Sequence, residues 1–391
     1  MLPGCLASLR GAVDEIIVVD TGSADGSAEL AARAGCTVSR LRWPGSFAEA
    51  RNVALAQATG QWILSIDADE RLDSPARLRR LVRAAPPGVG GFSVEQHNLL
   101  RVLDTGQRDV HPVDVVRVFR RHPRIRFEGA IHERIDGAVR SAGFAVRTSS
   151  VALRHLTAEL PEGYVARKQA RYLRMLDRAL REDPSDAWAR FQRGKAKLGL
   201  GRGKAALADL RAAEASRRAE PALRAMALNY RGVYAYEHGA PEEALDCAAR
   251  GLALFPSQSF AWFVRAEAHF QRGEWQEALR AFSRMRVTGT RVPPREPMSG
   301  DLCLTPEQRA YHRGRCLLAM GRADAAAREF ERGLVHAPEG TSCRFGLAHV
   351  ARLRGARGTA RRLLREAVRL DPGWTSAAQL LARWSAEGQR R

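Results

Sequence analysis

The chain is 391 residues long, and its 45% hydrophobic and 27% charged residues are typical of soluble globular proteins. This length suffices for two domains, each with its own core. The sequence has no apolar run of about 18 residues and no basic and apolar regions of a signal peptide at its start, so we expect neither a transmembrane helix nor secretion. The six cysteines form no CxxC pair, which excludes common zinc knuckles and dithiol redox motifs and favours a reducing compartment.

Positive charge is concentrated in the second half. Residues 1–160 hold 21 lysines and arginines against 18 acidic residues, whereas residues 161–391 hold 42 against 25. Such a balance suits an acidic partner, nucleic acid or an anionic membrane surface. Only four of the 63 cations are lysines, which we attribute to drift in a GC-rich genome. Because no segment interleaves aromatic residues with cations, we expect no nucleic-acid partner.

The first half alternates strand-like and helix-like segments. Apolar, β-branched runs predict strands at 16–19, 62–66, 91–94 and 115–119. Between the first two runs, the sequence predicts helices at 27–34 and 47–58. Continuous apolar strands between helices favour a parallel α/β sheet that is covered on both faces.

From about residue 164 onward, Ala- and Leu-rich helical sequence repeats. The repeat is marked by turn glycines at Gly239, Gly273, Gly321 and Gly355, with an earlier, looser copy at Gly201. Each of the four is followed after five residues by alanine and preceded by seven residues by a small residue. The first and last spacings are 34 residues, and the middle spacing of 48 leaves room for the Pro-rich loop at 292–297. The pattern predicts helix hairpins and resembles the tetratricopeptide repeat over roughly residues 185–386.

Asp20 follows the first predicted strand directly. Ligands of open α/β sheets bind outside the carboxyl ends of strands, so Asp20 is placed to accept a hydrogen bond from a base or ribose. The alternative is a simple turn in which Ser23 and Asp25 cap the helix that begins near Ser27.

The tetrapeptide Asp67-Ala68-Asp69-Glu70 follows a second strand. On an extended chain Asp67 and Asp69 point the same way and repel each other unless a cation lies between them. A divalent cation bound by one or two carboxylates and by substrate phosphates fits this pattern, and it would neutralise a leaving diphosphate. The alternative is a solvated acidic turn before a helix at Pro75. Arg51 either reaches the nucleotide or is an ordinary surface arginine.

In this order and at this spacing, the motifs resemble family 2 glycosyltransferases with the GT-A fold, and more closely the bacterial subgroup that carries tetratricopeptide repeats. The matching stretches are 14–26, 47–52, 62–70 and 127–133. The resemblance implies an α/β GT-A-like (nucleotide-diphospho-sugar transferase) domain at 1–160, a connecting helix at 161–184 and an all-α TPR solenoid at 185–391.

The same resemblance implies metal-dependent, inverting transfer from a nucleoside-diphosphate sugar to a glycan, lipid-linked or peptide acceptor, with Mg²⁺ or Mn²⁺ as cofactor. We expect a cytoplasmic protein, free or at the inner face of the membrane, with a protein partner on the repeats. The resemblance assigns nucleotide-sugar binding to Asp20, Arg51 and Asp67, metal binding to Asp69 and His155, and the role of general base to Glu133. The alternatives are a structural histidine at 155 and a salt bridge from Glu133 to Arg126 or Arg134.

Two features depart from the family. Its members open with an apolar strand and a Lys-Asn-Glu-like turn, whereas this chain opens with the sequence of the following helix, Met1 to Leu6. We therefore expect the first strand to be missing and the neighbouring backbone groups to be exposed. Thr157-Ala158 also stand where a Gly-Tyr-like pair is usual, which weakens the metal role of His155.

Two rival hypotheses remain. In the first, the repeats make an interaction scaffold and the α/β domain is a vestige. The second is nucleotidyl transfer on a similar sheet, which is disfavoured because the sequence has no GxxxxGK[ST] phosphate loop.

Overall fold

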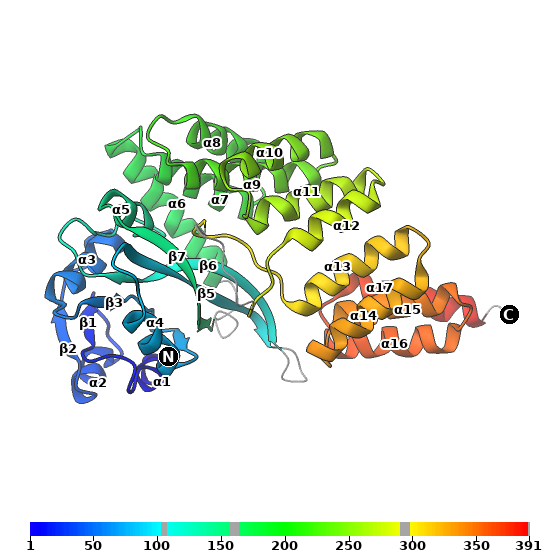
Figure 1. Cartoon of the computed structure of the whole chain (residues 1–391), viewed down its shortest axis with the longest axis horizontal. Helices are drawn as coiled ribbons and strands as arrows, with labels where there is room; N and C mark the ends of the chain where they lie inside the picture. The colour runs from blue at the N-terminus through cyan, green and yellow to red at the C-terminus, as the bar shows by residue number, and fades with distance from the viewer. Residues whose placement is uncertain (103–107, 157–163, 290–297, 390–391) are drawn as a thin grey trace.

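The computed structural model describes residues 1–102, 108–156, 164–289 and 298–389. As expected, an α/β domain is followed by an all-helical repeat region (Figure 1). Helices α6 to α12 lie beside the sheet of the first domain, and α13 to α17 form the other end of the molecule.

The strands of the first domain form two sheets. Strands β1 (Ile17–Asp20) and β2 (Thr37–Arg40) are a parallel pair. A five-stranded sheet has the order β3 (Trp62–Leu64), β6 (Arg108–Arg120), β5 (Val89–Val102), β7 (Ala145–His155), β4 (Glu70–Leu72). Its neighbours are antiparallel except for β5 and β7.

The expectation of a single parallel sheet is therefore wrong. Apolar runs indicate strands but not their direction, and the short connection between β5 and β6 makes them an antiparallel hairpin. Among the described residues, β1 pairs only with β2, and β3 pairs only with β6. One edge of β1 and one edge of β3 thus lack a strand partner, and the side chains of Ile17–Val19 and Trp62–Leu64 are only partly buried.

In the described part of this domain, the helices are α1 (Leu2–Ser8), α2 (Ser27–Arg33), α3 (Phe47–Gln57), α4 (Pro75–Arg83) and α5 (Asp136–Ser141). The starts of α3 and α4 are set by serine N-caps. Ser46 accepts a hydrogen bond from the N–H of Glu49, and Ser74 accepts one from the N–H of Arg77.

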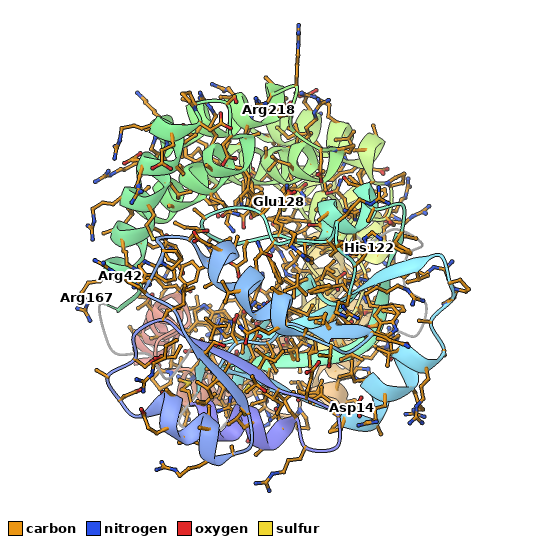
Figure 2. The ribbon with its side chains drawn as sticks, turned by 90° about the vertical axis from the view of Figure 1, so that its left-hand side faces the viewer. Asp14, Arg42, His122, Glu128, Arg167 and Arg218 are labelled. Carbon is orange, nitrogen blue, oxygen red and sulfur yellow. The ribbon has the colours of Figure 1, made fainter. Side chains whose placement is uncertain are left out.

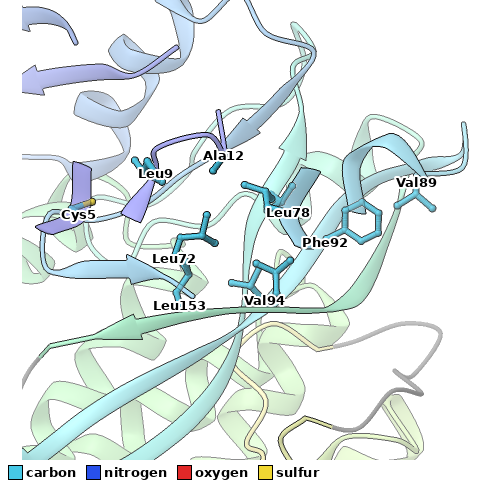
Figure 3. Close-up of a cluster of buried hydrophobic side chains, with 11 residues drawn as sticks. Cys5, Leu9, Ala12, Leu72, Leu78, Val89, Phe92, Val94 and Leu153 are labelled. Atoms are coloured by element: carbon cyan, nitrogen blue, oxygen red, sulfur yellow. The ribbon is translucent and has the colours of Figure 1, made fainter. Parts of the chain in front are cut away.

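The cores lie on both faces of the five-stranded sheet. On one face, side chains of α1 and α4 pack against β4, β5 and β7 (Figure 3), among them Cys5, Leu72, Leu78, Phe92 and Leu153. On the other face, α3 and α5 pack on Val116, Phe119 and Val146. The long strands β6 and β7 contribute to both cores: Val118 and Leu153 belong to the first, and Val116 and Val146 belong to the second.

The repeat region consists of a long helix followed by paired helices. Its elements are α6 (Tyr164–Glu182), α7 (Ala187–Gly199), α8 (Gly203–Ala215), α9 (Pro221–Glu237), α10 (Pro241–Leu254), α11 (Ser259–Gln271), α12 (Trp275–Arg284), α13 (Pro306–Ala319), α14 (Ala323–His336), α15 (Thr341–Leu353), α16 (Arg357–Leu370) and α17 (Thr375–Gln389). No described helix is both long and apolar enough to cross a bilayer.

The predicted turn glycines join the helices of each hairpin. Gly239, Gly273, Gly321 and Gly355 have φ between 73° and 77°, a left-handed conformation that glycine adopts without strain. The predicted small positions lie at helix contacts; Gly314, for example, faces the ring of Phe330. The period read from the sequence thus corresponds to the helix hairpins.

The repeat region contacts the sheet through the segment between α12 and α13, where the turn glycines are 48 residues apart. The N–H of Asp114 in β6 donates to the carbonyl of Asp301 over 2.9 Å, and Val113 forms an antiparallel bridge with Leu302. The carboxylate of Asp301 accepts from the N–H groups of Ser259 and Phe260 at the start of α11, both over 2.8 Å. The expected Pro-rich loop at 292–297 lies outside the described residues.

Candidate functional site

Arg51 is the centre of the polar cluster that the sequence predicts. Its Nη1 donates to the hydroxyl of Ser65 over 2.8 Å and its Nη2 to Asp67 Oδ1 over 2.5 Å, while its Nε donates to Glu133 Oε1. Helix α3 supplies the arginine, and Ser65 and Asp67 follow β3. Three residues that are far apart in sequence and predicted as site residues (Arg51, Asp67 and Glu133) therefore meet at the carboxyl end of one strand.

The turn that carries Glu133 is held in place by the neighbour of Arg51. The side chain of Asn52 accepts from the N–H of Phe127 over 2.9 Å and donates to its carbonyl over 3.0 Å. Glu128 and Arg134 then close the turn with two backbone hydrogen bonds of 2.9 Å. Helix α3 thus positions both the turn and the arginine that binds its carboxylate.

Glu133 forms an ion pair, but with a different arginine from Arg126 and Arg134, the two that the sequence suggested. Its partner is Arg51, whereas Arg134 lies 4.3 Å above the ring of Trp188 and 3.7 Å from Glu220. Only 10% of the Glu133 side chain is exposed, and its Oε2 accepts no hydrogen bond from the described residues. One carboxylate oxygen is therefore left for another donor.

A second arginine, Arg117, binds two carboxylates of the acidic turn that follows β3. Arg117 Nη2 lies 3.0 Å from Asp67 Oδ2 and 2.9 Å from Glu70 Oε1, and Glu70 Oε2 accepts from the N–H of Asp67 over 2.8 Å. Burial by itself would raise the pKa of Asp67, but Arg51 and Arg117 outweigh it and lower that pKa. Burial raises the pKa of Glu70, which is fully buried, and the charge of Asp67 adds to the rise.

Asp69 faces a different partner from Asp67. Its Oδ2 lies 3.4 Å from His155 Nε2. The expectation that Asp67 and Asp69 point the same way is wrong, because the chain turns here and the carbonyl of Asp67 accepts from the N–H of Glu70 over 2.9 Å. Although burial would raise the pKa of Asp69, the bond from His155 lowers it.

His155 is oriented by strand β5. Its Nδ1 lies 2.8 Å from Asn98 Oδ1 and 3.0 Å from Gln96 Nε2, which directs Nε2 to Asp69. Such a fixed ring is how proteins orient a histidine toward a metal. Among the described residues no three His, Cys, Asp or Glu side chains gather as a metal site. Asp69 and His155 together fit a divalent ion that takes its other ligands from substrate phosphates and water.

Asp20 is held by its own turn and not by Arg51. It ends β1, and its Oδ1 accepts from the N–H of Ser23 over 2.9 Å. The hydrogen bonds from Ser23 lower the pKa of Asp20. Asp25 accepts from the N–H of Ser27 over 3.1 Å, and the N-cap of α2 is Gly26. The local geometry matches the turn of the alternative but not its caps, because α2 has no side-chain cap hydrogen bond. Among the described residues, Asp20 forms no hydrogen bond with Arg51 or Asp67.

Sequence reasoning missed several residues of the site. Arg117 was detectable as a lone charge inside the apolar strand 115–119, and Glu70 belongs to the acidic tetrapeptide without having been given a role. Ser65, Gln96 and Asn98 carry no such signal, because only the pairing of β5 with β7 places Asn98 opposite His155.

Comparison with known proteins also separates an N-terminal α/β region from a C-terminal repeat region. Residues 1–146 match the profile of Glycosyl transferase family 2, and the ranges 191–259, 241–291 and 311–373 match the tetratricopeptide repeat. The N-terminal region is thus of the family 2 glycosyltransferase type, and the helices α7 to α16 are repeats of the tetratricopeptide type.

Two curated relatives are similar over part of the chain. A TPR repeat-containing protein of Synechococcus elongatus is 40% identical over 139 residues, which are 36% of this chain and 33% of that protein. The lipopolysaccharide core biosynthesis glycosyltransferase LpsC of Rhizobium meliloti is 39% identical over 93 residues, 22% of this chain and 34% of that protein. The chain spans about a third of the length of these relatives.

Among solved structures, a TPR protein of Thermus thermophilus is 17% identical, with a TM-score of 0.40 over 51% of this chain and 99% of its own. A tetratricopeptide repeat protein of Parabacteroides merdae is 16% identical, with a TM-score of 0.43 over 57% of this chain and 81% of its own.

Proposed function

We propose that this chain, which joins a glycosyl transferase family 2 region to tetratricopeptide repeats, transfers a sugar from a nucleoside-diphosphate sugar to an acceptor hydroxyl or thiol with inversion. The observation that carries the proposal is the arginine hub: one guanidinium binds the carboxylate after β3 and the carboxylate of the Glu133 turn. Transfer from a diphosphate needs a base for the acceptor and a cation for the leaving group, and Arg51 brings the carboxylate of the Glu133 turn next to the acidic turn after β3.

Glu133 is the general base of the proposed reaction. The acceptor oxygen forms a bond to the sugar C1 while the bond from C1 to the diphosphate oxygen breaks, and the electron pair leaves with the diphosphate. Glu133 Oε2, which has no partner among the described residues, takes the acceptor's proton. Arg51 donates a hydrogen bond to Glu133, and Asn52 bonds the backbone of the same turn at Phe127. The base is therefore positioned before the acceptor binds.

Arg51 and Arg117 balance the charge on the donor side. Both oxygens of Asp67 are bound by these two arginines, so Asp67 acts on the donor through them. Asp69 and His155 would hold a divalent ion, Mg²⁺ or Mn²⁺, and this ion would neutralise the diphosphate. Asp20 would reach the nucleoside from the end of β1, beyond the hub.

The test is a screen of the full chain against UDP- and GDP-sugars with Mg²⁺ or Mn²⁺, reading donor hydrolysis and calorimetric binding. We expect Glu133→Gln to lower turnover by about 10²- to 10⁴-fold while donor binding is kept. The matched control is Glu128→Gln, an exposed carboxylate in the same turn, which should change neither. The proposal fails if none of the sugar nucleotides binds or is hydrolysed.

The unpaired strand edges support a second candidate. No described strand pairs with the outer edge of β1 or of β3, which are the two strands that carry Asp20 and lead to Asp67. In that case the repeats act as an interaction scaffold for a protein partner and the first domain is inactive. Donor hydrolysis that is lost in Asp69→Ala would rule out the scaffold alternative.

A further inference from the structure

Helix α6 presents a row of arginines to solvent. Arg167, Arg171, Arg174, Arg178 and Arg181 are all exposed, and their spacing of four and three residues places them on one face. The opposite face carries Tyr172, Leu176 and Leu180, which pack on Ile131 and Ala189. The row runs about 21 Å along the helix at 1.5 Å per residue.

These arginines are poorly neutralised by the rest of the described chain. Arg178 pairs with Glu182 over 2.8 Å, but both side chains are largely exposed, so the pair is weak. Asp177 pairs with Arg193, and Asp183 pairs with Arg218. Of the acidic residues described in and next to the row, only Glu182 pairs with it, while Asp177 and Asp183 bind other arginines, so most of the row's positive charge faces water.

An exposed tryptophan stands beside the row. The side chain of Trp43 is 40% exposed, and its ring packs 4.8 Å from Phe47, which in turn lies 6.2 Å from Tyr172 of α6. A Cβ on Gly45 would lie 3.9 Å from Arg178 Nη1, so this loop borders the helix. Figure 2 shows Arg42 and Arg167 together at one edge of the molecule. We call the five arginines of α6 with Arg42 and Trp43 the α6 patch.

We propose that the α6 patch docks the protein onto an anionic membrane surface. A bilayer offers anionic headgroups in a plane, which matches a straight and solvated row of guanidinium groups, and each adjacent arginine contributes about a fivefold gain in binding. Trp43 suits the headgroup level, where amphipathic rings are enriched. Nucleic acid fits less well, because the patch has a single tryptophan and no interleaved aromatic residues for base stacking.

The candidate site lies across α6 from the arginine row. Tyr172 of α6 packs on Ile131, and its ring is 5.4 Å from that of His132, the neighbour of Glu133. Docking would therefore leave α6, which is about 10–12 Å wide, between the headgroups and the Glu133 turn. The docking itself requires no catalysis and does not depend on the proposed function.

The experiment is co-sedimentation of the full chain with vesicles of phosphatidylcholine, with and without about a third phosphatidylglycerol, near 0.1 M salt. We expect binding only to the anionic vesicles, and a loss of more than tenfold in R171E/R174E/R178E. The matched control is R357E/R361E/R365E, which changes the same charge on another arginine row, in α16, and should bind nearly as wild type does.

Further variants separate charge, aromatic contact and folding. R171Q/R174Q/R178Q should also weaken binding, which guards against misfolding of the charge-reversed chain, and circular dichroism checks both. Trp43→Ala should lower binding a few-fold at raised salt. The proposal is overturned if the α6 and α16 variants lose binding equally, if neutral vesicles bind as well, or if duplex DNA or an acidic peptide displaces the protein from vesicles at low concentration.

Discussion

Replacing Arg117 by methionine should destabilise the first domain in a pH-dependent manner. The change keeps most of the side-chain volume but leaves Glu70, which is fully buried, without its cation. Removing one partner of a buried ion pair costs about 3–5 kcal/mol. Asp67 adds little, because 37% of its side chain is exposed and Arg51 still binds it.

We therefore expect a loss of about 3 kcal/mol at pH 8, at the low end of that range because Glu70 is free to take up a proton. For a domain of this size, 1 kcal/mol corresponds to about 2–4 °C, so the first thermal transition should fall by about 6–12 °C. The measurement is differential scanning fluorimetry or near-ultraviolet circular dichroism. The two regions of the chain should be fitted as separate transitions.

The pH dependence of this stability loss shows whether the buried charge of Glu70 causes it. Burial raises the pKa of Glu70 in the wild type, and Arg117 opposes that rise, so the variant's pKa is higher still. A raised pKa in the folded state means that stability is kept at low pH and lost as the pH rises through that value. The deficit of the variant should accordingly be largest at pH 8 and become small near pH 5.

Two controls accompany this test. Adding Glu70→Gln to the variant should recover more than half of the lost stability, because no buried charge then remains at that position. Arg120→Met changes an arginine of the same strand that donates to the carbonyl of Val89 and covers the ring of Trp62 but binds no carboxylate of the described residues. Its effect should be small and independent of pH. An equal deficit for Arg117→Met at pH 5 and pH 8 would refute the electrostatic reasoning and point to packing.

Further predictions concern the junction and the repeats. Burial raises the pKa of Asp114 to about 7 and that of Asp301 to about 6, so their contribution to stability is lost as the pH rises through 6 to 7. Thermal unfolding should show a lower transition at pH 8 than at pH 5.5, and Asp114→Asn should flatten this difference; a slope unchanged in the variant would contradict it. Gly314→Ala should cost about 1–3 kcal/mol in denaturant unfolding, because its Cβ would collide with the ring of Phe330. Gly358→Ala, which meets nothing within 4 Å on helix α16, should instead stabilise by about 0.5–1 kcal/mol, and the collision argument fails if both changes have the same sign.

Local sequence patterns predicted much of this protein. The turn glycines and small positions gave the helix hairpins, because backbone freedom and close packing each require particular residues at fixed spacing. The positions of β1, β3, α2 and α3 followed from short apolar runs and helical periods. Of the candidate site residues, Arg51, Asp67 and Glu133 meet in the structure as one cluster.

Other features depend on contacts that sequence spacing does not encode. The direction of the strands and the pairing of Asp69 with His155 follow from how distant segments meet. Arg117 and Asn98 become part of the site only because β6 and β5 pass beneath it.

The sequence by itself determined which residues are charged, small or apolar at each helical and strand position, since these patterns act over a few residues. Tertiary structure alone decided which carboxylate each arginine binds, because ion pairs such as Arg51 with Glu133 join residues 82 positions apart. It likewise decided that the exposed row of α6 lies beside Trp43, since only folding brings these two segments together.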